Sequence, residues 1–122
     1  MKKIALIEDN PDNRLLVRSL LDEIYAFDEY ENGIEGLSGL RRLKPDLVLL
    51  DISLPGMDGP SVLKEIRADP GLQALPVIAL TAHAMQGDRD KFLSMGFDEY
   101  LTKPIEDEDI LKRVISSCLA GN

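Results

Sequence analysis

The sequence predicts a doubly wound α/β fold, in which helices cover both faces of a five-stranded parallel sheet. Three observations lead to this fold class: short unbroken apolar runs, longer stretches of helical periodicity between them, and short connections throughout. Unbroken apolar runs of about four residues are typical of strands buried on both faces of a parallel sheet. Because predicted strands and helices alternate along the whole chain, each strand is expected to reach the next through a crossover helix.

Five segments are expected to form the strands. Three of them are the continuous apolar runs at 4–7, 47–50 and 77–80. The segments 27–31 and 99–102 contain more polar residues, so they are expected nearer the edges of the sheet.

The first helix is expected to begin at Asn10 and Pro11, because Asn is a favoured N-cap and Pro fits the first helical position. Apolar residues then recur at every fourth position and are expected to face the sheet. These residues are Leu16, Leu20 and Ile24.

The next three helices are predicted from their apolar stripes and their end signals. The second is expected over 33–43, the third from Gly59 onward, and a short fourth over 87–95, where Gly96 ends it. The residues expected to face the core are Ile34, Leu37 and Leu40 in the second helix, and Val62, Leu63 and Ile66 in the third.

The fifth helix has the clearest apolar stripe, which consists of Ile110, Leu111, Val114, Ile115 and Cys118. Cys118 is therefore placed on a buried face as a small hydrophobic residue. Because it is the only cysteine of the chain, an internal disulfide and a cysteine-based zinc site are both excluded.

Composition and charge restrict the class of function. A length of 122 residues with 44% hydrophobic and 30% charged residues is typical of a single folded domain over 1–122. The net charge of −8 would repel nucleic-acid phosphates, so direct nucleic-acid binding is not expected. No apolar run approaches the roughly 20 residues of a membrane span, and the run after Met1 is too short for a signal peptide. A cytoplasmic protein is expected.

Polar residues follow four of the five predicted strands. Glu8 and Asp9 follow the first strand, Asp51 the third, Thr81 the fourth and Lys103 the fifth. In open α/β sheets the ligand site lies outside the carboxyl ends of the strands, at the point where the strand order reverses. Each residue alone is explained as a turn or cap, but their occurrence at one sheet edge indicates a site.

These residue types indicate phosphoryl-transfer chemistry. Neighbouring carboxylates repel one another, and a divalent cation with oxygen ligands, most simply Mg²⁺, removes that cost. Asp51 is placed as a nucleophile that forms an acyl phosphate. Lys103 and the Thr81 hydroxyl are placed to contact the phosphoryl oxygens.

Over essentially its full length the sequence resembles the receiver domain of bacterial response regulators. The motifs that carry the resemblance are Glu8-Asp9-Asn10, Asp51, Leu54-Pro55-Gly56-Met57-Asp58-Gly59, Thr81-Ala82 and Lys103-Pro104. The resemblance implies a flavodoxin-like (βα)5 fold and a phosphorylation-dependent switch in a two-component or phosphorelay system. The segment 81–88 looks like that of receivers in hybrid kinases, phosphorelays and single-domain cell-cycle regulators.

The resemblance also implies roles for individual residues. Glu8 and Asp9 would form an acidic pocket, and Asp9, Asp51 and the backbone carbonyl of Ser53 would bind Mg²⁺. Asp51 would be the phosphoacceptor. The residues that would contact its phosphoryl group are Thr81 and Lys103, and the bond between Lys103 and Pro104 would be cis.

Three further residues, Tyr100, Ser53 and His83, are expected to take part in the response or to set how long it lasts. Tyr100 stands where the family has its switch aromatic, which would follow Thr81 and change the surface formed by the fourth helix, fifth strand and fifth helix. The alternative for Tyr100 is an edge-strand aromatic packed on the last helix. Ser53 and His83 are expected to tune the lifetime of the acyl phosphate, with an inert exposed side chain as the alternative for His83.

The resemblance implies a histidine kinase or a histidine phosphotransfer protein as phosphoryl donor, and a downstream protein as target. The chain would catalyse only its own phosphoryl transfer and dephosphorylation and would not otherwise be an enzyme. Three alternatives stay open. One is an aspartate-nucleophile phosphohydrolase, although Ser53 stands where that class has a second Asp. The others are a receiver that only binds a partner, and a receiver cut from a hybrid kinase or DNA-binding regulator rather than a stand-alone protein.

Overall fold

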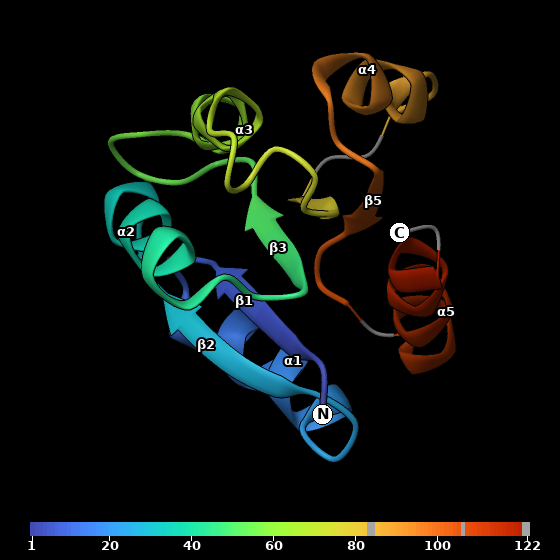
Figure 1. Cartoon of the computed structure of the whole chain (residues 1–122). Helices are drawn as coiled ribbons and strands as arrows, with labels where there is room; N and C mark the ends of the chain where they lie inside the picture. Colours follow the sequence, from blue (N-terminus) through green and yellow to red (C-terminus); the bar gives the residue numbers. More distant parts are fainter. Residues whose placement is uncertain (83–84, 106, 121–122) are drawn as a thin grey trace.

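The computed structural model describes residues 1–82, 85–105 and 107–120, which form one parallel sheet with helices on both faces (Figure 1). Strands and helices alternate along the chain, as predicted. The strands are β1 (Lys3–Ile7), β2 (Ala26–Tyr30), β3 (Leu47–Asp51), β4 (Val77–Thr81) and β5 (Glu99–Thr102). The helices are α1 (Pro11–Leu21), α2 (Gly33–Leu43), α3 (Gly59–Ala68), α4 (Asp88–Met95) and α5 (Glu108–Ala120). The predicted fold class is confirmed.

The strand order is β2-β1-β3-β4-β5, and every neighbouring pair is parallel. The three apolar runs form the central strands, and every residue of β3 and β4 is buried. The more polar segments form the edges, as predicted: β5 spans the expected 99–102, and β2 begins and ends one residue before the expected 27–31.

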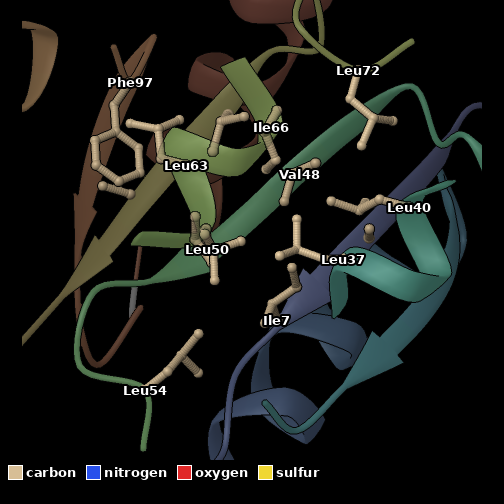
Figure 2. Packing of buried hydrophobic residues seen from close by; sticks show 14 of the residues in the cluster. Ile7, Leu37, Leu40, Val48, Leu50, Leu54, Leu63, Ile66, Leu72 and Phe97 are labelled. Carbon is tan, nitrogen blue, oxygen red and sulfur yellow. The ribbon is translucent and has the colours of Figure 1, made fainter. Parts of the chain in front are cut away.

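Alternate residues of each strand supply two hydrophobic cores, because successive side chains of a strand point to opposite faces. Ala5 and Ile7 of β1 belong to the core beneath α2, α3 and α4, whereas Ile4 and Leu6 belong to the core beneath α1 and α5. Figure 2 shows the first of these cores, in which side chains from α2 and α3 pack against β3.

Half of the predicted inward-facing helix residues are buried and four more are half-buried, but three lie at the surface. Ile24 follows the end of α1, while Ile34 and Ile110 lie in the first turns of α2 and α5. Ile34 is 72% exposed, and the other two are more than two-fifths exposed. The expectation for these residues was wrong because an apolar stripe is buried only where another layer of the fold lies against that turn.

In α1 the buried residues are Val17 and Leu21 rather than the predicted Leu16, Leu20 and Ile24. Cys118 of α5 is half-buried and packs against the second core, in keeping with its expected hydrophobic role. Burial, followed by the charges of Asp98 and Glu99, raises the pKa of its thiol to about 11, so the thiol stays protonated at neutral pH. None of the helices within the described residues is long and apolar enough to cross a membrane.

The strand order places the end of β1, which is followed by Glu8 and Asp9, beside the end of β3, which carries Asp51. After β1 the chain crosses to β2 on one side and then returns to β3 on the other, so β1 and β3 are neighbours. Ile7 of β1 is in register with Leu50 of β3, which brings Glu8 and Asp51 together at the carboxyl ends. This is the switch point at which ligand sites occur in doubly wound sheets.

Candidate functional site

Three carboxylates gather at the carboxyl ends of β1 and β3. Glu8 and Asp51 are buried, Asp9 is exposed, and one ligand oxygen from each lies within 4.8 Å of the others. Burial of two carboxylates in contact is costly unless a cation or hydrogen bonds offset the charge. The cluster is therefore either partly protonated or balanced by a cation.

Lys103 supplies one such cation from the end of β5. Its Nζ lies 2.9 Å from Glu8 Oε1 and 3.0 Å from Asp51 Oδ2. Burial alone would lower the pKa of Lys103, but its bonds to the two carboxylates outweigh burial and raise it, so the ammonium stays charged. The bond from Lys103 to Pro104 is cis, as expected, and the Lys103 N–H donates to the Thr81 carbonyl at 2.7 Å.

The Glu8 carboxyl has a raised pKa. Burial raises its pKa to about 7, with a further rise from Asp51, while the Asn10 N–H and Lys103 bonds oppose the rise. Close to neutral pH this carboxyl is therefore partly protonated. A cation held by these carboxylates would favour the deprotonated form of Glu8.

Backbone and side-chain donors hold the two buried carboxylates. The Asn10 N–H donates to Glu8 Oε2 at 3.1 Å and the Asn13 amide to Glu8 Oε1 at 3.3 Å. The Ser53 N–H donates to Asp51 Oδ1 at 3.0 Å. At Gly59, where α3 begins, an added Cβ would collide with the Asp51 carbonyl, so only glycine permits this close approach.

Of the remaining predicted residues, Thr81 and Ser53 lie at or after the ends of β4 and β3, and Tyr100 lies against α4. Thr81 is buried at the end of β4, next to β3 in the sheet, and Ser53 is exposed in the loop after β3. Tyr100 of β5 is half-buried, and its ring centroid lies 5.6 Å from that of Phe92 in α4. Tyr100 packs against the core beneath α2, α3 and α4, on the face of the sheet opposite α5. The alternative prediction, that Tyr100 packs on the last helix, is therefore wrong. His83 lies outside the described residues.

Two residues at this site were missed by sequence reasoning, Asn13 and Arg14. Both lie in the first turn of α1, and the Arg14 guanidinium donates to the Glu8 carbonyl at 2.7 Å. Their position directly after an acidic pair and a helix N-cap was the available signal.

The donor set fits Mg²⁺. Glu8, Asp9 and Asp51 offer only carboxylate oxygens, and hard oxygen donors are the ligands that Mg²⁺ prefers. Within the described residues, no histidine nitrogen or cysteine sulfur joins these three carboxylates as a possible ligand.

Comparisons with known proteins agree with this geometry. The model of the response regulator receiver domain family matches residues 4–115. The chain is 40% identical over 105 residues to the polar-differentiation response regulator DivK of Brucella anthropi, covering 85% of each protein. It is 38% identical over 117 residues to the sensor protein GacS of Pseudomonas syringae pv. syringae. This match covers 93% of the chain but 13% of GacS, so the chain spans a small part of that relative.

Among solved structures, the receiver domain of the sensor histidine kinase PA1611 from Pseudomonas aeruginosa PAO1 has a similar fold. Its TM-score is 0.87 at 36% sequence identity, and the match covers 98% of each chain. That crystal structure has a magnesium ion coordinated in its active-site cleft.

Proposed function

Since the chain belongs to the response regulator receiver domain family of two-component and phosphorelay systems, we propose that Asp51 accepts a phosphoryl group in a Mg²⁺-dependent reaction. The observation that carries the proposal is the position of the Asp51 carboxylate. It is buried at the switch point of the sheet, bonded to the Lys103 ammonium at 3.0 Å and to the Ser53 N–H at 3.0 Å. Two donors fix the orientation of this carboxylate, and a fixed orientation favours its attack on a phosphorus atom.

The reaction balances with a phosphohistidine donor. An Asp51 oxygen forms a bond to phosphorus, the bond from phosphorus to the donor's imidazole nitrogen breaks, and the imidazole takes up a proton. The Lys103 ammonium contacts an oxygen of the transferred group and offsets its negative charge, and the Thr81 hydroxyl contacts another. Glu8, Asp9, Asp51 and the Ser53 carbonyl would hold Mg²⁺, which supplies charge neutralisation for the transferred group.

The partners follow from this chemistry. The donor would be a histidine kinase or a histidine phosphotransfer protein, and the receiver domain over 1–122 would catalyse only its own phosphorylation and dephosphorylation. Ser53 and His83 would tune the lifetime of the acyl phosphate. Phosphorylation would shift a pre-existing equilibrium through Thr81 and Tyr100, and the surface of α4, β5 and α5 would then bind a downstream protein differently. The contact of Tyr100 with Phe92 of α4 supports this route.

Intact mass after incubation with acetyl phosphate and Mg²⁺ tests the proposal. Wild type is expected to gain about 80 Da, the mass of one phosphoryl group, and Asp51→Asn is not. Asp58→Asn is the matched control, because Asp58 lies in the same loop and its side chain caps α3 by accepting from the Ser61 N–H, as an Asn side chain can also do. Wild type that binds Mg²⁺ but gains no mass from acetyl phosphate or a phosphohistidine donor would overturn the proposal.

A further inference from the structure

We propose that Arg14 is a positioning residue that fixes the peptide joining Glu8 to Asp9, and thereby sets the affinity of the acidic cluster for Mg²⁺. The inference rests on the proposed function, because it concerns the cation site that function requires. Arg14 itself contacts none of the carboxylate oxygens of the cluster in the described contacts. Its action is through the backbone of Glu8.

The contacts of Arg14 join three elements of the fold. Its Nη1 donates to the Glu8 carbonyl oxygen at 2.7 Å, which is at the short end of the range for such bonds. Its Nε lies 3.5 Å from Glu29 Oε1 in β2, and the side chain is only 20% exposed. The guanidinium thus ties the end of β1 to α1 and to β2.

The Glu8 peptide depends on this contact because β1 ends at Ile7. The Glu8 N–H still donates to the Tyr30 carbonyl at 3.0 Å. The Glu8 carbonyl has left the strand ladder, and within the described residues its hydrogen-bond partner is Arg14. The Glu8 carbonyl belongs to the peptide bond between Glu8 and Asp9. Rotation of this peptide would therefore change the direction in which the Asp9 side chain points.

Two physical effects of Arg14 act in opposite directions. A guanidinium near the cluster repels a divalent cation, so removal of its charge alone would tighten Mg²⁺ binding. Loss of a group that orients ligands weakens metal binding, typically by 10- to 100-fold. The sign of the change therefore separates a positioning role from a purely electrostatic one.

Arg18 provides a matched control on the same helix. Its Nη1 lies 2.9 Å from Glu29 Oε2, so it shares the carboxylate partner of Arg14 one turn further along α1. The contact that the structure gives Arg18 is to Glu29, not to the backbone of Glu8. Arg18→Met therefore removes one positive charge and one Glu29 contact while it leaves the Glu8 carbonyl bond in place.

The experiment is titration of the full chain with Mg²⁺, monitored by calorimetry and by the NMR amide shifts of residues 8–10. Arg14→Met is expected to raise the Kd for Mg²⁺ by about tenfold. Arg14→Lys keeps the charge but offers one nitrogen in place of a fork, so it cannot serve Glu8 and Glu29 together and is expected to raise the Kd by a smaller factor. Arg18→Met is expected to leave the Kd unchanged or slightly lower.

Unfolding midpoints of the metal-free variants separate positioning from stability. A merely structural role would lower the midpoint of Arg14→Met without a change in Kd, and that result would overturn the inference, as would a Kd lowered in Arg14→Met. If Arg14→Met fails to fold, a Kd for Arg14→Lys equal to that of wild type overturns it instead. Wild type without measurable Mg²⁺ binding would overturn the proposed cation site itself, and the inference with it.

Discussion

Replacement of Lys103 by Met removes the ammonium that balances two buried carboxylates. The Nζ atom lies 2.9 Å from Glu8 Oε1 and 3.0 Å from Asp51 Oδ2, and those side chains are 1% and 2% exposed. Removal of one partner from a buried ion pair costs about 3–5 kcal/mol. Both carboxylates retain backbone N–H donors, so we expect the lower end, about 3 kcal/mol in metal-free protein at pH 8.

The expected loss can be followed by thermal unfolding. Unfolding entropy for a domain of this length converts about 3 kcal/mol into a midpoint lowered by about 12 °C. The loss should shrink at pH 5, where Glu8 is protonated, and should also shrink with Mg²⁺, because the cation takes over part of the charge balance. The control is Lys112→Met, which removes an exposed pair with Glu108 on α5 and is expected to change the midpoint little.

One result would refute this reasoning. If Lys103→Met at pH 8 without Mg²⁺ unfolded within about 2 °C of wild type, the two carboxylates would not depend on the ammonium for their charge balance.

Three further predictions concern stability. Because the pKa of Glu8 is raised from 4.5 to about 7, the native state binds more protons than the unfolded state between these values. The free energy of unfolding of metal-free protein should therefore fall as pH rises from about 5 to 7, and Glu8→Gln should remove that slope in urea titrations at the two pH values. Gly39→Ala places a Cβ against the Tyr30 ring and should lower the free energy of unfolding by about 1–3 kcal/mol. Gly71→Ala, where the nearest atom is 3.4 Å away, should lower it by less. An equal loss of stability in the two variants would contradict the packing argument. Arg67→Met removes donors to three backbone carbonyls, two in the loop before β4 and one at Gly96 after α4, and should cost about 2–4 kcal/mol by urea unfolding. An unchanged midpoint would show that those carbonyls find other partners.

The local sequence was sufficient to predict the strands and helices and most of the residues at which they begin and end. Unbroken apolar runs predict buried parallel strands because both faces of such a strand must be covered. Asn10 caps α1 through bonds from the Asp12 and Asn13 N–H groups, and Gly96, with φ of 113°, ends α4. These features depend on a few neighbouring residues, so they can be predicted without knowledge of the fold.

The sequence also determined which residues meet at the site, because parallel strands bring their carboxyl ends to one edge. Glu8, Asp9 and Asp51 cluster there, and Lys103 reaches them from β5. What only the tertiary structure decided is how these groups act on one another. The pKa of Glu8 depends on its burial and on Asp51, and the bond from Arg14 to the Glu8 carbonyl depends on the path of the chain after β1.

Exposure of Ile34 and Ile110 has the same origin. Both fit the apolar period of their helices, yet both lie in first turns where the structure leaves them at the surface. Periodicity specifies a direction around a helix axis, whereas burial requires a partner layer at that height along the axis. The first is a property of the local chain, and the second exists only after the sheet and its helices have packed together.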